Sequence, residues 1–591
     1  MTTTFQLPPR SSHHGSCGRL RNALPALAAI AASAVVGGCA GAPPRPAPIP
    51  LSAVAAAPAP AGFTILQIND TYKIEGLRAG TEGGMSRVRT LRKQIESEGR
   101  PVLVLHAGDF LYPSVMSKYL AGVPMVDALN LLDGAPDFDD RLFVVPGNHE
   151  FDNADSQVLF DRIAQSKFRW LSSNVDIRGP GDSPLHPLAG SFPNVLDHVV
   201  LELGGIKVGI FGLTLDDQRR PWLEYGYDLE PRRKTVARVL DALTSEGAEF
   251  VVALTHQEIE EDVWLAREFG ARIDWIVGGH EHVMSKQTVG RTTITKADAD
   301  AKSAFRIDVR RAGEATGTKG AVVASSALVE LDASVANDPD LIREVASSLV
   351  TLERTVEEKT GRRLLDVAAT TEHLLEGTEP AIRGRETALG DLLCDFLRAR
   401  FSADIAMVNG GAIRVNDDVP AGGNVRVYEL EGIFYYDDKP VVYEITGAEL
   451  VDLLRKSVSQ ATLGHGRFLQ VSGVRFRYHA AADGRTTIDP AEVAVRRNGE
   501  AQFGTLELAG RYRVTSPTYL WRNGYRDGYL LFSAGNGATS PALVEEPTIS
   551  WRALTEEAIA ALPGRRITTD VDGRIERVAA GAGGAGGTGV E

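Results

Sequence analysis

Side chains that bind metal ions follow short apolar runs in the first half of the chain. Asp70 comes just after the run FTILQI, and Asp109 comes just after PVLVLHA. Carboxylate, amide and imidazole groups are oxygen and nitrogen donors that suit Zn, Mn, Fe or Co. Two such cations can share one carboxylate and hold a water against a phosphoryl group, and Asp109 is the best candidate for the shared ligand. The other donors are Asn148 with His149 after RLFVVP, His256 at the end of FVVALTH, and His280 and His282 after IDWIVGG.

The runs that precede these residues have the composition of buried β-strands. All six, KVGIFGL included, are rich in Val, Ile and Leu, and amphipathic stretches such as RVRTLRKQIESEG separate some of them. Near-continuous apolar strands indicate sheets that are covered on both faces, so the predicted fold class is α/β. Ligands of such sheets bind outside the carboxyl ends of the strands. We therefore expect the donors to meet at one rim of a sheet, where glycines before Asp109, Asn148 and His280 let the backbone turn sharply.

The chain is too long for one hydrophobic core. It has 591 residues, whereas single cores rarely exceed ~250–300 residues. We predict a first domain over residues 62–335, a linker helix within 336–362 that starts at Asp338 or Asp340, and a second α/β unit over 363–577. In the second unit, ETALGDLLCDFLRARF and TGAELVDLLRKSV predict amphipathic helices, the latter capped by Thr446.

The first 39 residues have the layout of a secretory signal. The apolar run LPALAAIAASAVVGGCAG follows Arg19 and Arg21. Its end, VGGC, resembles a bacterial lipobox, which would place a lipid anchor on Cys39. We therefore expect an exported bacterial lipoprotein, in the periplasm or anchored to the outer membrane. Residues 40–61 are typical of a flexible Ala/Pro linker, and residues 578–591 of a disordered tail.

The composition narrows the range of partners. The formal net charge of −14 argues against a nucleic-acid-binding protein, which normally has a basic surface. Cys394 is the only cysteine beyond the signal region and lies on an apolar helix face, so we expect a core cysteine and no disulfide framework. The sequence does not indicate an oligomeric state.

The ordered set D…GD…GNHE…H…GHEH closely resembles the calcineurin-like metallophosphatase family. The resemblance implies a four-layer αββα sandwich and two divalent metal ions, drawn from Zn, Mn, Co, Mg and Fe. It implies that His149 is not a ligand but donates a proton to the leaving oxygen, and that Asp152 orients it. The implied ligands are Asp70, Asp109 and His282 for one ion, and Asp109, Asn148, His256 and His280 for the other.

The first block departs from the family pattern. Relatives carry Asp-x-His, whereas this chain has Asp70-Thr71-Tyr72. Tyr72 could coordinate as a phenolate, which would favour a harder ion such as ferric iron. Alternatively Tyr112 could do so, because GDFLY matches the GDxxY pattern of purple acid phosphatases. In a third outcome the site is weak and water fills the gap.

Four blocks in the second half resemble, in order, the C-terminal domain of 5'-nucleotidases: IRGRETALGDLL, VNGGAIR, GRFLQVSG and RDGYLLF. With the first domain, the resemblance covers about residues 63–560. It implies a substrate-binding domain in which Asp527 binds ribose hydroxyls and two rings sandwich the base. Tyr436 and Trp521 fall at the ring positions, with Tyr519 as the alternative if the register differs by two residues. The other implied nucleotide contacts are Arg383, Asn409 and Arg414.

Together these features predict an exported, metal-dependent phosphoesterase of the 5'-nucleotidase type that acts on nucleotides through a metal-activated water. Asp438 stands where relatives have an amide, so the base preference cannot be carried over. One alternative is the same fold acting on another ester, such as a 2',3'-cyclic nucleotide, a UDP-sugar or a sulfur ester. The other is a nucleotide-binding lipoprotein with weak turnover.

Overall fold

The computed structural model describes residues 62–579, except 136, 180–182, 218–219, 313–319, 482–483 and 533–539. The predicted signal, the lipobox with Cys39 and nearly all of the predicted linker and tail lie outside these residues. The described residues all belong to one compact unit. Within them, no helix has the length and apolar character needed to cross a membrane.

The six apolar runs of the first domain are strands, as predicted, but they divide between two sheets. The first sheet has the order β16-β15-β1-β2-β3-β4-β7, and β1 to β4 run parallel. The second has the order β13-β14-β12-β11-β9-β8, and β9, β11, β12 and β14 run parallel. The first sheet comprises β1 (Gly62–Ile68), β2 (Val102–His106), β3 (Leu142–Val144), β4 (Arg169–Leu171), β7 (Val195–Leu196), β15 (Ser303–Arg311) and β16 (Val322–Glu330), and the second β8 (His198–Leu203), β9 (Ile206–Thr214), β11 (Phe250–His256), β12 (Trp275–Gly279), β13 (Ser285–Val289) and β14 (Thr292–Lys296).

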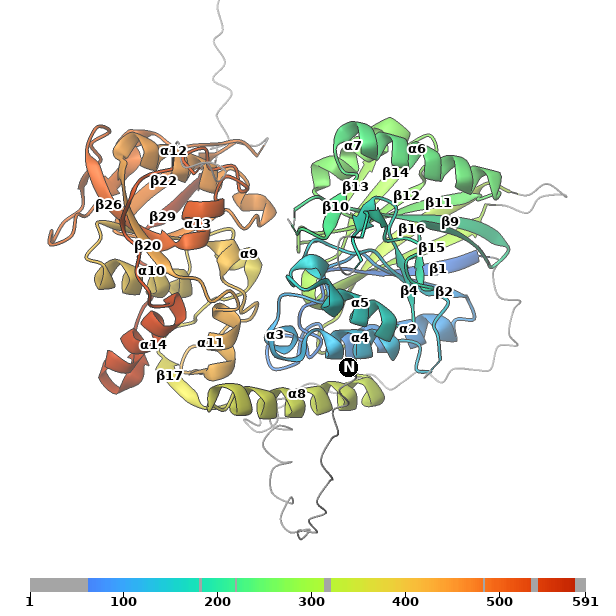
Figure 1. Cartoon of the computed structure of the whole chain (residues 1–591), viewed down its shortest axis with the longest axis horizontal. Coiled ribbons are helices and arrows are strands. Elements are labelled where there is room, and N and C mark those ends of the chain that lie inside the picture. Colours follow the sequence, from blue (N-terminus) through green and yellow to red (C-terminus); the bar gives the residue numbers. More distant parts are fainter. Residues whose placement is uncertain are drawn as a thin grey trace, which may run out of the picture. The chain divides into compact units, whose positions relative to one another are not determined.

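Helices cover the outer faces of both sheets, so the first domain has the predicted four layers (Figure 1). Side chains that alternate along β1 show the layering: Phe63 and Ile65 pack between the two sheets, while Leu66 and Ile68 pack against the helices of the first sheet. The second sheet packs its other face on α6 and α7. The helices are α2 (Met85–Ser97), α3 (Val115–Leu120), α4 (Val123–Asn130), α5 (Ser156–Gln165), α6 (Leu229–Ser245) and α7 (Ile259–Phe269), and a small sheet contains β5 (Val175–Ile177), β6 (His186–Pro187) and β10 (Leu223–Tyr225).

The segment between the two domains is the long helix α8 (Pro339–Thr360). Asp338 is its N-cap, because its carboxylate accepts hydrogen bonds from the backbone N–H groups of Asp340 and Leu341. The buried stripe of α8, which includes Leu341 and Leu352, belongs to the apolar cluster of the first domain, and α8 contacts α2, α3 and α4. The helix is therefore packed on the first domain and is not a free tether.

The second domain places a five-stranded sheet, in the order β21-β18-β26-β20-β27, between helices. Alternation along β18 again separates the layers: Ile405 and Met407 pack in the cluster that holds α12, while Ala406 and Val408 pack in the cluster that holds α10 and α14. Cys394 of α10 is buried in the latter, as expected of a core cysteine. Thr446 caps α12 with a reciprocal bond to Glu449, also as predicted.

The elements of this domain have the following bounds. The helices are α9 (Glu379–Ile382), α10 (Ala388–Arg400), α11 (Val427–Ile433), α12 (Gly447–Val458), α13 (Thr518–Asn523) and α14 (Trp551–Ala561). The strands are β17 (Val367–Thr371), β18 (Ile405–Asn409), β19 (Asn424–Arg426), β20 (Pro440–Thr446), β21 (Leu469–Ser472), β22 (Val474–Ala480), β23 (Thr486–Thr487), β24 (Val493–Val495), β25 (Gly504–Thr505), β26 (Arg511–Pro517), β27 (Leu543–Glu545), β28 (Arg566–Ile567) and β29 (Ile575–Ala579).

Candidate active site

The predicted metal ligands gather at the carboxyl ends of both sheets of the first domain, not at the rim of a single sheet. Asp70, Asp109 and Asn148 follow β1, β2 and β3 of the first sheet, whereas the three histidines end or follow β11 and β12 of the second. The expectation of one sheet was wrong because a run of apolar strands does not reveal where the chain crosses to the opposite layer. We call this group the ligand rim: Asp70, Asp109, Asn148, His256, His280 and His282.

The backbone of the ligand rim is strained. Asp70, Asp109, His280 and His282 have φ angles of 52°, 59°, 90° and 58°, in the left-handed region that residues other than glycine seldom adopt. The backbone at Gly147 passes so close to Asp109 that a larger residue would clash there. A Cβ on Gly147 would lie 2.1 Å from Oδ1 of Asp109. Such strain persists only where the surrounding structure imposes it, and it is concentrated at functional sites.

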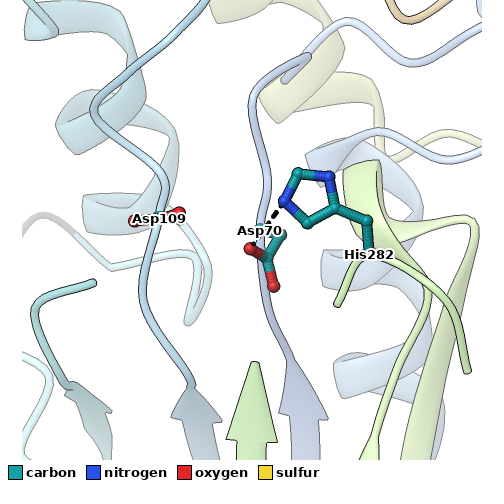
Figure 2. Close-up of side chains that lie close together, drawn as sticks. All are labelled: Asp70, Asp109 and His282. Carbon is teal, nitrogen blue, oxygen red and sulfur yellow. Dashed lines mark ion pairs between the residues drawn. The ribbon is translucent and has the colours of Figure 1, made fainter. Parts of the chain in front are cut away.

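Three rim residues form a compact cluster of two carboxylates and one imidazole. Asp70, Asp109 and His282 each offer one donor atom, and these atoms all lie within 4.8 Å of one another (Figure 2). Nε2 of His282 lies 3.2 Å from Oδ1 of Asp70. All three residues are buried, so a bound cation would offset the cost of placing two carboxylates in the interior.

A second group meets at the other side of Asp109. Nδ1 of His256 donates to the carbonyl oxygen of Ala107 at 2.7 Å, because a carbonyl can only accept. Nε2 of the same ring lies 3.1 Å from Oδ1 of Asn148 and 3.2 Å from Oδ2 of Asp109. In the neutral ring this Nε2 carries a lone pair that faces the two oxygen atoms. Three such donor atoms could bind one cation between them. Asn148 is oriented for this role, since its Nδ2 donates to Asp217 at 3.2 Å.

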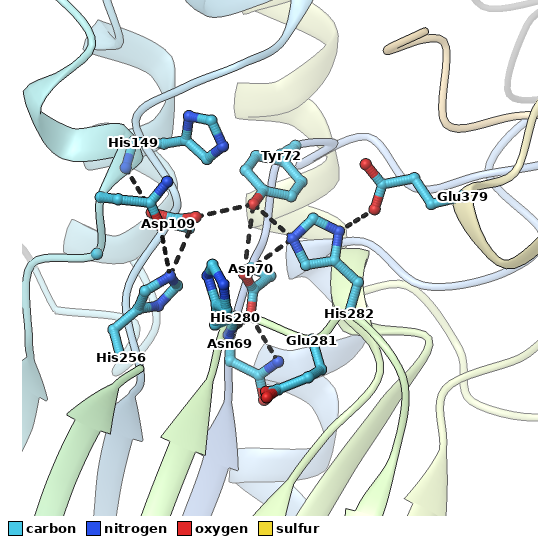
Figure 3. A network of polar contacts seen from close by, with 12 residues as sticks. Asn69, Asp70, Tyr72, Asp109, His149, His256, His280, Glu281, His282 and Glu379 are labelled. Atoms are coloured by element: carbon cyan, nitrogen blue, oxygen red, sulfur yellow. Dashed lines mark hydrogen bonds and ion pairs between the residues drawn. The ribbon is translucent and has the colours of Figure 1, made fainter. Parts of the chain in front are cut away.

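The proposed bridging oxygen touches both groups. Oδ2 of Asp109 lies 3.2 Å from His256 and 3.1 Å from the hydroxyl of Tyr72, which in turn contacts Asp70 and His282 (Figure 3). Burial raises the pKa of Asp109, but in the metal-free protein the positive charges of protonated His256 and His149 outweigh burial, so the pKa is lowered and the carboxylate stays ionised. The donor set therefore fits two cations that share Asp109.

His280 contributes differently from the other rim histidines. Its ring lies 5.3 Å from the ring of His256, and its backbone N–H donates to Asp70 at 3.0 Å. Its Nε2 lies 3.5 Å from Oε1 of Glu258. Burial lowers the pKa of His280, but the Glu258 carboxylate outweighs burial and raises it to about 9. In the form that the structure describes, His280 is therefore paired with an acid that sequence reasoning did not single out.

Glu150 holds the loops that carry the rim. Its carboxylate accepts hydrogen bonds from the backbone N–H groups of Asp109, Phe110 and Leu111 at 2.8–3.0 Å, and from that of Gly147 at 2.5 Å. Burial raises its pKa to about 7, with the nearby Asp109 carboxylate adding to the effect. The acid of the GNHE block is thus a positioning residue, and only its place in the motif hinted at this.

The predicted acid pair is formed. Nδ1 of His149 lies 2.8 Å from Oδ2 of Asp152, and the backbone N–H of His149 donates to Asp109 at 2.8 Å. Burial lowers the pKa of His149, but Asp152 and Asp109 outweigh burial, so the pKa is raised above its ordinary value. A raised pKa keeps a proton on the imidazole near neutral pH, which suits a general acid.

A cavity of about 1000 Å³ opens over the rim. It is lined by Asp109, Asn148, His149, Asp152, His280 and His282 of the first domain and by residues of the second. Of the predicted nucleotide contacts, five line it, and Tyr519 lines it in addition. We call these the cavity wall: Arg383, Asn409, Arg414, Tyr436, Tyr519 and Asp527.

Trp521 does not line the cavity, which corrects the ring register expected from the sequence. It packs against an apolar cluster of the second domain, and its indole N–H donates to the carbonyl oxygen of Pro541 at 2.9 Å. The helix α13 turns Tyr519 toward the cavity, and Asp438 fixes its backbone by accepting its N–H at 2.7 Å. Asp438 thus has a structural partner where relatives carry an amide.

Several polar atoms of the cavity wall are buried without a hydrogen-bond partner. Within the described chain these include Oδ1 of Asn409, Oδ2 of Asp527 and the Nε atoms of Arg383 and Arg414. Burial raises the pKa of Asp527 to about 6, although Arg467 partly offsets the effect. Buried polar groups are normally paired, so unpaired donors and acceptors that share a cavity point to a ligand that supplies both.

Glu379 joins the wall to the rim and was not predicted. One carboxylate oxygen accepts from Arg414 at 3.1 Å and from Arg383. The other contacts Nδ1 of His282 (Figure 3). Because Arg414 and His282 lie 35 and 97 residues away in the chain, no local sequence signal could have found the link between wall and rim.

Comparisons with known proteins agree with this arrangement. A model of calcineurin-like phosphoesterases matches residues 63–284, and a model of the 5'-nucleotidase C-terminal domain matches residues 367–532. A snake venom 5'-nucleotidase of Naja atra is 27% identical over 509 residues, which cover 79% of this chain and 91% of the relative.

Two solved structures share the fold. A 5'-nucleotidase precursor of Thermus thermophilus aligns with a TM-score of 0.67 at 23% identity, over 87% of this chain and 99% of the other. A sulfate thiohydrolase of the same genus and species aligns with a TM-score of 0.60 at 16% identity, over 88% and 98%. The chain is a phosphoester hydrolase that resembles 5'-nucleotidases, with a segment that matches calcineurin-like phosphoesterases followed by one that matches the 5'-nucleotidase C-terminal domain.

Proposed function

We propose that the protein is an exported metal-dependent 5'-nucleotidase that releases phosphate from nucleoside 5'-monophosphates. One observation carries this proposal: a single cavity joins the ligand rim, the His149–Asp152 pair and the unpaired polar groups of the cavity wall. A substrate that fills the cavity can therefore present a phosphate to the rim and a nucleoside to the wall.

The ligand rim would hold two divalent cations, with Asp109 between them. When bound, such ions supply Lewis-acid activation of the phosphoryl group and an activated water. The first ion has Asp70, Asp109 and His282 as ligands in this proposal, and the second has Asn148, His256 and His280 together with Asp109. Glu150 and the bond from His256 to Ala107 fix the rim before a substrate arrives.

The phosphate and the leaving oxygen have their own partners. Arg383 and Arg414 line the cavity beside His282 and share the Glu379 carboxylate, so a phosphate can take over their free donors. Nδ1–H of His149 donates to the Asp152 carboxylate, and the raised pKa of the ring favours a second proton at Nε2. From there the imidazole can pass the proton to the 5'-oxygen as the ester bond breaks.

The nucleoside would be bound by the remaining wall residues. A carboxylate accepts two hydrogen bonds, so Asp527 suits the two ribose hydroxyls, and Asn409 offers a further acceptor. Tyr436 and Tyr519 come from separate segments and line the same cavity, where they would stack on the base. Stacking of this kind contributes ~1–3 kcal/mol per base and discriminates little between bases.

A substrate panel tests this proposal. The chelated protein is reloaded in turn with Mn, Co, Zn, Mg and Fe, and phosphate release is measured from four nucleoside 5'-monophosphates, a UDP-sugar and a 2',3'-cyclic nucleotide. Hydrolysis of a sulfur ester is followed in parallel. We expect the highest kcat/KM for the 5'-monophosphates; a higher value for another ester would reassign the substrate. Tight nucleotide binding without turnover under every metal would instead favour the nucleotide-binding lipoprotein.

We also propose that the protein is exported and lipid-anchored through Cys39, on the basis of the sequence over residues 1–39. Expression of the full chain in a bacterium with a radiolabelled fatty acid should label the protein and place it in the membrane fraction. Cys39→Ser should lose the label. If the Ser variant keeps the label, the anchor lies elsewhere.

A further inference from the structure

The hydroxyl of Tyr72 lies in the middle of the first metal cluster. It is 2.9 Å from Nε2 of His282, 3.1 Å from Oδ2 of Asp109 and 3.3 Å from Oδ1 of Asp70 (Figure 3). The side chain is only 1% exposed. A tyrosine that merely fills core volume would have no reason to direct its one polar atom at three metal ligands.

A single phenol cannot satisfy the three atoms around it. The carboxylates of Asp70 and Asp109 accept hydrogen bonds, and Nδ1 of His282 faces a Glu379 carboxylate, so Nε2 of the neutral ring is also an acceptor. The hydroxyl has one proton to donate. At least two of its three short contacts therefore join lone pairs to lone pairs, and these contacts need a positive charge between them.

The spacing of the four atoms matches a common coordination shell. Zn and related ions are bound by oxygen and nitrogen at about 2.1 Å, so ligands at right angles lie about 3.0 Å apart and tetrahedral ligands about 3.4 Å apart. The three hydroxyl contacts of 2.9–3.3 Å and the contact of 3.2 Å between His282 and Asp70 fall in or beside this range. The phenol oxygen is thus placed as a fourth donor.

We propose that Tyr72 is a ligand of the first cation and that its phenolate oxygen makes this site selective for a hard, highly charged ion, with ferric iron as the test case. The proposal rests on the metal centre of the proposed function. Binding releases the phenol proton to solvent, because a ligand oxygen must give up its proton to coordinate strongly. Three anionic donors, Asp70, Asp109 and Tyr72, then face one neutral imidazole, and hard oxygen donors favour hard ions.

Tyr112, in the second block (GDFLY), provides a matched control for Tyr72. It is also buried, at 5% exposure, and its ring packs in the apolar cluster on the helix side of the first sheet. It lines the cavity, but no contact between its hydroxyl and the ligand rim is found in the described part of the chain. A Tyr→Phe change at either position removes one oxygen atom and keeps the ring.

The experiment uses the purified chain, stripped of metal and reloaded with ferric iron. Bound iron per chain is measured together with the visible absorption spectrum, because a tyrosinate–ferric bond gives a charge-transfer band that carboxylates and imidazoles do not. We expect the band in the wild type and in Tyr112→Phe, and its loss in Tyr72→Phe. Tyr72→Phe should also bind ferric iron at least about tenfold more weakly. Tyr72→His should shift the preference toward Zn and Co.

Two outcomes overturn the inference: a band that persists in Tyr72→Phe, or a wild type that binds iron without a band. Near-ultraviolet circular dichroism on each variant shows that the fold is retained, and Tyr72→His supplies a second test if Tyr72→Phe does not fold. Failure of the metal centre itself looks different. In that case Asp109→Asn would bind Mn or Zn as well as the wild type does, and the proposed function would fall with the inference. Binding of Mn or Zn that depends on Asp109, without an iron band, would overturn only the role of Tyr72.

Discussion

The ligand rim and the cavity wall face the same cavity but satisfy their polar atoms in opposite ways. In the rim, Oδ1 of Asp109 accepts a backbone N–H while Oδ2 meets His256 and Tyr72, and both nitrogens of His256 have a partner. In the wall, Asp527 and Asn409 each keep a buried acceptor without a partner. The rim is therefore positioned by contacts within the protein and would be completed by cations, whereas the unpaired groups of the wall would be satisfied by a substrate. Loss of a rim group should reduce kcat, and loss of a wall group should raise KM.

The largest effect is expected at the shared carboxylate of the rim. Asp109→Asn keeps the size of the side chain, and Asn tolerates the left-handed φ of 59° at this position. The amide lacks the charge that would bridge two cations, so we expect kcat/KM to fall by about 1000-fold or more, together with the metal content. Steady-state kinetics and metal analysis of the purified variant measure both.

Asp176→Asn is the control for that change, because Asp176 lies in β5 and does not line the cavity. It should retain wild-type kinetics. Near-normal turnover of Asp109→Asn would show that the rim does not act as a shared metal centre, and the contrast with the wall would then lose its basis.

The loss of activity on replacing His149, the predicted proton donor, should depend on the leaving group of the substrate. His149→Asn should lower kcat for a nucleoside 5'-monophosphate by about 100-fold, because an alkoxide leaving group needs a proton. An aryl phosphate whose phenolate leaves readily should lose much less. The ratio of the two kcat values in wild type and variant measures this.

Asp152→Asn tests whether the orienting acid acts through His149. Its carboxylate is 2.8 Å from Nδ1 and helps to raise the pKa of His149. We expect a smaller loss with the same preference for the aryl ester. An equal loss on both esters, for either variant, would argue that these residues bind phosphate and do not move a proton.

We expect the cavity wall to favour substrate binding at the expense of fold stability. Asp527 allows both effects to be measured. Its pKa is about 6 in the folded protein against 3.8 for the ordinary group. As the pH rises through this interval, the unfolded chain releases the proton while the folded chain keeps it, so stability falls. Above about pH 6 the full cost, on the order of 2–3 kcal/mol, is present.

Asp527→Asn should therefore raise the melting temperature at pH 7.5, and the gain should shrink to about half at pH 5. The same variant should raise KM for a ribonucleotide. Thermal unfolding at the two pH values, with kinetics at pH 7.5, measures both. A variant that is less stable than the wild type at pH 7.5 would show that Asp527 holds the fold together and is not kept for a ligand.

The rim was predictable from the sequence, and the wall only in part. Asp70, Asp109 and His256 each stand at the end of an apolar run, so a local pattern placed them at strand ends. That two sheets supply them could not be predicted, because apolar runs look alike in either layer. Wall residues such as Arg383 stand in motifs, but the direction of Tyr519 depends on how α13 turns after β26, and Glu379 reaches the rim through His282, which is distant in the chain.

The smallest expected effect tests which aromatic ring of the second domain, Tyr519 or Trp521, stacks on the base. Tyr519 lines the cavity, whereas Trp521 packs in an apolar cluster and bonds to Pro541. Tyr519→Ala should raise KM for AMP by about tenfold, the loss of one stacking ring, with little change in melting temperature. Trp521→Ala should instead lower the melting temperature, because it leaves a cavity in that cluster, and should leave KM unchanged below the transition. The reverse pattern, with KM raised only by Trp521→Ala, would restore the register expected from the sequence and would mean that α13 turns when the nucleotide binds.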